Sequence, residues 1–412
     1  KASLFDQLAK KLLFSLLRGL RWGELTIIEG SVRRSFGEKS DQFPLGATIP
    51  VPHTRFYSSV VFGGSIGASE AFMAGQWSTD DLTAVVRIII LNRELLQGME
   101  KGLARLTTPL HKFFHLLRSN TKRGSRLNIA AHYDLGNDFY KLFLDETLTY
   151  SCGIFEAEDC TLKEASLAKY DRICQKLNLS SEDHIVEIGS GWGGFAIHAA
   201  QNYGCRVTTT TISRAQHDLA RERIHKAEVA HKVELLLEDY RDLKGKYDKL
   251  VSIEMIEAVG HQYLDEFFRS CSKLLKEDGM MLLQAITMTD QIFDQHKRSV
   301  DFIKRYIFPG RCIPSIAAIT SSVARVTDLK LFHLEDITCH YAKTLRTWRQ
   351  RFFANIDKVR ALGYPETFIR MWEYYFSYCE AGFAERYIGD VQMLFAKPMC
   401  RRESLVPDLT AC

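Results

Sequence analysis

The sequence has no Cys-x-x-Cys pair, although it contains ten cysteines scattered between residues 152 and 412. This spacing argues against a zinc site or a redox motif, so we expect no metal and reduced thiols in a cytosolic enzyme. No apolar run reaches the roughly 18 residues of a membrane span, and even the stretch at 85–91 is interrupted by Arg87. The net charge of +4 is too small to indicate a nucleic-acid partner.

The length of 412 residues exceeds what one core usually holds, so two domains are expected. Residues 3–20 predict a basic amphipathic helix, which either packs on its own domain or lies on a membrane. Strand-like runs follow at 25–28, 31–36 and 55–62, and a helix is predicted from Leu82 to about Met99. Residues 1–100 are therefore assigned to a small α+β domain, and the basic residues 101–127 to a linker.

Residues 185–196 are typical of a buried strand, a glycine-rich turn and the start of a helix. The glycines at 189, 191, 193 and 194 let a ligand come close to the backbone at the carboxyl end of a strand. A dinucleotide site would need an acid about 20 residues later, but the next strand, at 205–211, has no carboxylate. NAD is therefore disfavoured, and Glu187 is placed to face the cationic end of a ligand such as S-adenosylmethionine.

Strands and helices alternate after this turn, which indicates a mainly parallel α/β sheet. Strands are predicted near residues 185–188, 205–211, 232–237, 247–253 and 279–286, with later runs at 329–334 and 391–396. An aromatic, mostly helical insertion at 288–328 is a candidate lid or substrate tunnel. Helices are expected from Thr344 and from Glu366, and the end of the chain, 401–412, is expected to fray. The second domain is assigned to residues 128–400.

Several motifs lie in a fixed order along residues 128–398. They are Ala131-His-Tyr-Asp-Leu-Gly-Asn-Asp-Phe-Tyr, Tyr150-Ser-Cys-Gly-Ile-Phe, Val186-Glu-Ile-Gly-Ser-Gly-Trp-Gly-Gly, Thr211-Ile-Ser-Arg-Ala-Gln, Glu238-Asp-Tyr-Arg-Asp-Leu, Ser252-Ile-Glu-Met-Ile-Glu-Ala-Val-Gly, Tyr306-Ile-Phe-Pro-Gly and Tyr341-Ala-Lys-Thr-Leu. In this order they strongly resemble the cyclopropane-fatty-acyl-phospholipid synthases. The resemblance implies a class I methyltransferase fold, a doubly wound and mostly parallel sheet, behind a smaller lipid-associating domain.

The resemblance also implies the reaction and the cofactor site. S-adenosylmethionine would give a methylene group to the cis double bond of an unsaturated acyl chain in a membrane phospholipid. It further implies a homodimer that works in the cytoplasm, peripheral on the inner face of the membrane. The implied cofactor-binding residues are Tyr150, Ser151, Glu187, Gly189, Gly191, Trp192, Gly193, Thr211, Gln216, Asp239 and Tyr240.

By the same resemblance, a bound bicarbonate removes a proton from the carbocation that forms on the acyl chain. The groups implied to hold it are Cys152, Glu257, Tyr341 and the backbone near Ile286. Because two anions in contact raise a pKa, we expect Glu257 to orient the bicarbonate and to take up its proton. Gln284 stands where many family members have a histidine; it can donate a hydrogen bond to the anion but cannot titrate.

The departure at Gln284 leaves open a fatty-acyl C-methyltransferase that gives a methyl-branched or methylene product. A methyltransferase for a small soluble acceptor is a further alternative, although the aromatic insertion argues against it. A non-catalytic lipid-binding protein with the same fold is the alternative from another functional class, and the intact glycine turn, Cys152 and Glu257 argue against it.

Overall fold

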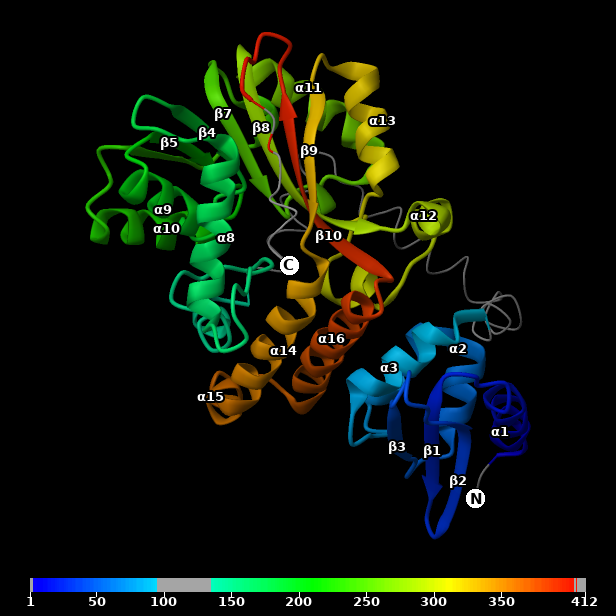
Figure 1. Ribbon diagram of the computed structural model, residues 1–412. Helices are drawn as coiled ribbons and strands as arrows, with labels where there is room; N and C mark the ends of the chain where they lie inside the picture. Colours follow the sequence, from blue (N-terminus) through cyan, green and yellow to red (C-terminus); the bar gives the residue numbers. More distant parts are fainter. Residues whose placement is uncertain (1–2, 95–134, 404, 406–412) are drawn as a thin grey trace. The chain divides into compact units, whose positions relative to one another are not determined.

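The computed structural model describes residues 3–94, 135–403 and 405, and it divides into two compact units (Figure 1). Among the described residues, the first unit contains 3–94, 298–309 and 345–387, and the second contains 135–297, 310–344, 388–403 and 405. The predicted linker at 101–127, the helix end near Met99, the motif start at 131–134 and most of the tail at 401–412 lie outside the described residues.

The first unit is built on a three-stranded sheet of order β2-β1-β3, in which β1 runs antiparallel to β2 and parallel to β3. Its elements are α1 (Leu4–Leu17), β1 (Gly23–Glu29), β2 (Val32–Glu38), β3 (Gly46–Pro50), α2 (Arg55–Met73), α3 (Leu82–Leu91), a π-helix at Ile303–Ile307, α15 (Ile356–Ala361) and α16 (Glu366–Ala384). Helix α14 (Thr338–Ala354) begins in the second unit and continues into the first. Segments 298–309 and 345–387 thus belong with the first unit, which the sequence did not indicate.

The strand predicted at residues 55–62 is wrong, because these residues form the first turns of α2. Their aromatic and β-branched composition favours a strand, but Phe56, Tyr57 and Val61 are buried together on the helix. Packing in the core therefore overrides the local propensity. Strand β3 was not predicted, since five residues that end in a proline carry a weak pattern.

The second unit contains a seven-stranded sheet of order β6-β5-β4-β7-β8-β10-β9. Strands β4 to β8 run parallel, and β10 runs antiparallel to both of its neighbours. The strands are β4 (His184–Ile188), β5 (Arg206–Thr210), β6 (Val233–Leu236), β7 (Tyr247–Ile253), β8 (Leu275–Met288), β9 (Lys330–Asp336) and β10 (Ile388–Ala396). This arrangement confirms the predicted, mostly parallel α/β sheet.

Helices cover both faces of this sheet (Figure 1). Residues of α8 (Leu162–Leu177), α9 (Gly194–Asn202) and α10 (Arg214–Lys226) pack in one core, and residues of α11 (Leu264–Leu274) and α13 (Ile316–Val326) pack in the other. The unit also contains α7 (Asn137–Tyr140), α12 (Asp290–His296) and short 3₁₀ turns at Tyr240–Asp242, Ile256–Ala258 and His261–Tyr263. On β8, Met281 and Leu283 pack in the core with α11 and α13, whereas Met280 and Leu282 pack with α8 and α9. This alternation buries both faces, as a parallel sheet requires.

Because helices cover both faces of the sheet, a ligand has to bind at its edges. Open α/β sheets bind ligands at the carboxyl ends of their parallel strands. In the described part of the chain, no helix is long and apolar enough to cross a membrane.

Candidate active site

The glycine turn between β4 and α9 has the backbone shape that its sequence predicts. Gly189, Gly191 and Gly193 have φ values of 99°, 50° and 83°, in the left-handed region that favours glycine. The amides of Gly189 and Ser190 donate to the carbonyl oxygen of Thr210 at 3.1 and 2.9 Å, which ties the turn to the end of β5. A Cβ at Gly191 would meet no atom within 4 Å, so the backbone there is open to a ligand.

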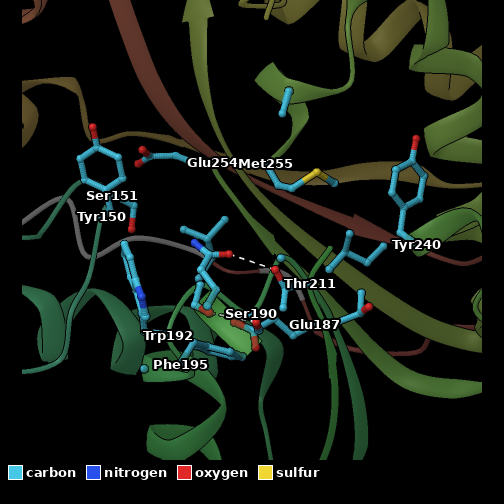
Figure 2. Close-up of a pocket in the computed structure, with 18 of the residues that line it drawn as sticks. Tyr150, Ser151, Glu187, Ser190, Trp192, Phe195, Thr211, Tyr240, Glu254 and Met255 are labelled. Atoms are coloured by element: carbon cyan, nitrogen blue, oxygen red, sulfur yellow. Dashed lines mark hydrogen bonds between the residues drawn. The ribbon is translucent and has the colours of Figure 1, made fainter. Parts of the chain in front are cut away.

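A pocket lies at this edge of the sheet, between the turn and the ends of β5 and β7 (Figure 2). Ten of the eleven predicted cofactor-binding residues line it: Tyr150, Ser151, Glu187, Gly189, Gly191, Trp192, Thr211, Gln216, Asp239 and Tyr240. Gly193 does not line the pocket and instead caps the amino end of α9. The structure therefore brings together residues that are up to 90 positions apart in the sequence.

Glu187 lies on β4, two residues before the first glycine of the turn, and it is only 2% exposed. Its Oε2 accepts a hydrogen bond from Thr209 Oγ1 at 2.5 Å. Burial raises the pKa of Glu187 to about 7, although the Thr209 hydroxyl and the Lys169 charge oppose this shift. A cationic group in the pocket would favour the ionised form of Glu187, since opposite charges lower the pKa of a carboxyl.

Other predicted pocket residues are fixed by their neighbours. The Thr211 hydroxyl donates to Gln216 Oε1 at 2.9 Å, so the two side chains hold each other at the end of β5 (Figure 2). Asp239 pairs with the Arg241 guanidinium through two hydrogen bonds of 2.8 and 2.7 Å. The carboxylate of Asp239 is therefore shared with a cation of the chain itself.

The pocket also has lining residues that the sequence did not indicate, among them Phe195, Glu254, Met255 and Arg311. Glu254 is the most informative of them, because it is an ionisable side chain directly after β7. An acid at the carboxyl end of a parallel strand was a usable signal. Glu254 lies inside the motif Ser252-Ile-Glu-Met-Ile-Glu-Ala-Val-Gly, for which the resemblance implied a role only for Glu257.

The Glu254 carboxylate accepts hydrogen bonds from three groups. Its Oε1 accepts from the Cys152 backbone N–H and from Gln284 Nε2, both at 2.8 Å. Its Oε2 accepts from the Tyr341 hydroxyl at 2.5 Å. Cys152, Gln284 and Tyr341 are thus brought together, as predicted, but around a side chain of the protein.

Glu257 and Asp390 are two buried carboxyl groups beside the half-buried Glu254. Glu257 Oε1 accepts from the Ile286 backbone N–H at 2.6 Å, whereas in the described residues neither Glu257 Oε2 nor Asp390 Oδ1 has a hydrogen-bond partner. Burial, with the charge of Glu254 as a second cause, raises the pKa of Glu257 to about 8. The same two causes raise the pKa of Asp390 well above its ordinary value.

These contacts do not fit the bicarbonate site that the resemblance implied. The donors of Cys152, Gln284 and Tyr341 are directed at Glu254, and the Ile286 amide is directed at Glu257. The Cys152 thiol donates to the Gly153 carbonyl oxygen at 3.2 Å, and burial raises its pKa. Since the chain's own carboxylates take the implied anion donors, no step is derived through bicarbonate.

The raised pKa of Glu257 makes the stability of the protein depend on pH. Between the ordinary carboxyl value of 4.5 and about 8, the folded protein keeps a proton that the unfolded chain has released. The free energy of unfolding therefore falls as pH rises through this window and levels off above about pH 8. Glu257→Gln cannot lose a proton, so we expect the change in unfolding free energy between pH 5 and 8 to shrink by roughly 4 kcal/mol.

Denaturant unfolding of both proteins at pH 5, 6.5, 8 and 9 measures this difference. Glu277→Gln is the matched control, because Glu277 is exposed on β8. A pH profile of Glu257→Gln parallel to that of the unchanged protein would contradict the expectation.

Comparisons with known proteins show which chemistry this arrangement serves. Residues 120–393 match the family described as mycolic acid cyclopropane synthetase. The chain is 39% identical over 336 residues to a tuberculostearic acid methyltransferase of Mycobacterium tuberculosis, covering 80% of this chain and 78% of that protein. It is 34% identical over 361 residues to the cyclopropane-fatty-acyl-phospholipid synthase of Escherichia coli, covering 85% and 88% of the two chains.

Solved structures support the same conclusion. A mycolic acid cyclopropane synthase crystallised with SAH and CTAB has a TM-score of 0.62 and 33% identity, covering 66% of this chain and 98% of that one. A cyclopropane synthase from Mycobacterium tuberculosis has the same TM-score at 32% identity, covering 66% and 98%. The second unit thus has the predicted class I methyltransferase fold. The chain belongs to the mycolic acid cyclopropane synthetase family and is an S-adenosylmethionine-dependent methyltransferase that modifies lipid double bonds.

Proposed function

We propose that this enzyme adds a methylene unit to the cis double bond of an unsaturated acyl chain in a membrane phospholipid and so forms a cyclopropane ring. The observation that carries the proposal is the pocket wall formed by Tyr150, Trp192, Met255 and Glu254, which places aromatic and apolar surface beside the Glu254 carboxylate (Figure 2). The choice of a phospholipid is supported by the similarity to the Escherichia coli synthase.

The pocket residues meet the demands of this chemistry. S-adenosylmethionine, when bound, supplies a methyl group on a positively charged sulfur. An alkene is a weak nucleophile, and its attack leaves a carbocation on the acyl chain, which aromatic ring faces stabilise. Tyr150 and Trp192 are held at ring-centroid distances of 5.4 and 5.0 Å from Tyr140, so their orientations are fixed by packing.

A second product is supported by a specific comparison. The relative at 39% identity is named a tuberculostearic acid methyltransferase, and another relative is named a probable fatty acid methyltransferase. If a hydride shift moves the charge to the carbon that bears the new methyl group, loss of a proton from that methyl gives a methylene group, and a methyl branch would then require a separate reductant. Since the comparisons show an enzyme, a non-catalytic lipid-binding protein is not retained as an alternative.

The product decides between these outcomes. The purified enzyme is incubated with S-adenosylmethionine and phospholipid vesicles that contain cis-unsaturated acyl chains, and the lipids are studied by mass spectrometry and proton NMR. A mass gain of one CH2 group with cyclopropane ring protons supports the proposal. The same gain with olefinic methylene protons supports the second product, and unchanged lipids contradict both.

We further propose that the enzyme works as a peripheral protein on the inner face of the membrane. Helix α1 buries Leu13, Phe14 and Leu17 on one side. On the other side Leu4, Phe5, Leu8 and Leu12 are 85, 56, 57 and 40% exposed. Lys11 and Arg18 are exposed beside this apolar stripe, a pattern that suits an anionic lipid surface. The homodimer stays a prediction.

Leu8→Glu is expected to weaken binding to anionic phospholipid vesicles by about tenfold or more, because burial of a leucine side chain contributes about 1.5–3 kcal/mol and the new charge is repelled. Vesicle sedimentation measures the effect. Leu362→Glu is the matched control, since Leu362 is similarly exposed at 46% and follows α15. Equal binding of the two variants would contradict a role for α1.

A further inference from the structure

We propose that Glu254 is the catalytic base of this enzyme, a carboxylate of the chain itself that takes the proton a free anion would otherwise remove. The inference rests on the proposed function, because it assigns the proton acceptor of that reaction. It replaces the implied bicarbonate with a side chain.

Three donors surround the Glu254 carboxylate. Hydrogen bonds of 2.8, 2.8 and 2.5 Å come from Cys152 N, Gln284 Nε2 and Tyr341 Oη. Two of these donors are directed at Oε1 and only the Tyr341 hydroxyl is directed at Oε2. The arrangement fixes the orientation of the carboxylate.

Glu254 also has access to the pocket. Glu254 lines the pocket together with Tyr150, Ser151 and Met255 (Figure 2). Cys152, Glu257, Gln284 and Tyr341 are not among the described residues that line it. Among the groups implied for proton removal and their direct partners, Glu254 is therefore the one that can meet a substrate.

The backbone of Glu254 has a φ of 49°. A side chain rarely adopts this left-handed conformation, and such strain concentrates at functional sites. The three donors to its carboxylate hold the residue in place. Glycine adopts the same backbone without strain, so Glu254→Gly is compatible with the fold.

Ionisable groups lie around Glu254. Burial and the charge of Glu254 raise the pKa values of Glu257 and Asp390, which favours the protonated forms of these two carboxyls. Lys169 is fully buried, donates to Ser151 Oγ at 2.7 Å, and its charge interacts favourably with Glu254. The cluster thus places a buried amine near the Glu254 carboxylate.

The proposed step balances without a further reactant. The π electrons of the alkene form a bond to the methyl carbon, and the carbon–sulfur bond breaks with its electron pair left on sulfur. A C–H bond of the transferred methyl group then breaks, the proton goes to a Glu254 oxygen, and the electron pair closes the ring onto the cationic carbon. The protonated Glu254 later returns its proton to water.

The test compares turnover in carbonate-free buffer with turnover after addition of bicarbonate. We expect the unchanged enzyme to be equally active in both. Glu254→Gly is expected to lose about 100-fold or more, as for removal of a general base, and to regain at least tenfold with bicarbonate, which can occupy the space and accept from the same donors. The ¹³C NMR signal of labelled bicarbonate is expected to broaden with this variant and not with the unchanged enzyme.

Glu254→Gln is the second variant, which tests the same inference if Glu254→Gly does not fold. It keeps the shape of the side chain, so we expect a similar loss of turnover, no recovery with bicarbonate, and an affinity for S-adenosylmethionine within about threefold of the unchanged enzyme. An unchanged enzyme that needs bicarbonate, or a Glu254→Gln variant that keeps full turnover, would overturn the inference. A complete lack of lipid product from the unchanged enzyme in either buffer would instead overturn the proposed function.

Discussion

Glu187→Ala is expected to abolish measurable binding of S-adenosylmethionine while the protein stays folded. Glu187 lies at the end of β4, lines the pocket and is almost completely buried. Truncating one partner of a buried charge pair costs about 2–5 kcal/mol, so a loss of affinity of roughly 100-fold or more is expected. The same change removes a carboxyl group whose charged form is disfavoured by burial. Thermal unfolding should therefore show no large loss of stability.

Isothermal titration with S-adenosylmethionine measures this loss. Glu182→Gln is the control, because Glu182 is exposed in the turn before β4. The pKa of about 7 for Glu187 adds a second readout. Since the ionised carboxylate binds the cationic ligand, affinity should fall about tenfold per pH unit below about pH 7, and Glu187→Gln should lack this dependence. Tight binding by Glu187→Ala would contradict the role of this carboxylate.

The glycine turn could be predicted because its constraints are local. Gly189, Gly191 and Gly193 have positive φ values. A strand followed by several glycines indicates a tight turn of this kind, because glycine adopts positive φ without a steric cost. The position of β10 between β8 and β9 could not be predicted in the same way. Strand order depends on which distant segments pair, and no local pattern records it.

Glu254 shows the same limit inside the candidate site. Its motif was recognised, and its place after β7 followed from the alternation of strands and helices. Its partners Cys152 and Tyr341 lie 102 and 87 positions away, so their hydrogen bonds become visible only when the chain is folded. The resemblance pointed to the donors, and the structure showed which carboxylate they hold.

Gln284→Glu is expected to disrupt the carboxyl cluster of Glu254, Glu257 and Asp390, because it replaces the amide N–H donor of Gln284 with a carboxylate oxygen. Gln284 Nε2 donates to Glu254 Oε1 at 2.8 Å and to Asp390 Oδ2 at 3.2 Å, and Gln284 Oε1 accepts from Gln392 Nε2 at 3.0 Å. A carboxylate in this place would face two acceptors and would add a buried charge. The free energy of unfolding at neutral pH should fall by about 3–5 kcal/mol, as for other unpaired buried charges.

The loss should depend on pH in a defined direction. A buried carboxyl introduced beside Glu254 has a raised pKa in the folded state, so the folded variant gains protons relative to its unfolded chain, and its deficit should shrink as pH falls from 8 to 5. Denaturant unfolding measures the deficit, with Gln201→Glu as the control on the exposed part of α9. A deficit equal at both pH values would contradict the arrangement. Turnover should fall with stability at pH 8, because the donor that orients the Glu254 carboxylate is lost.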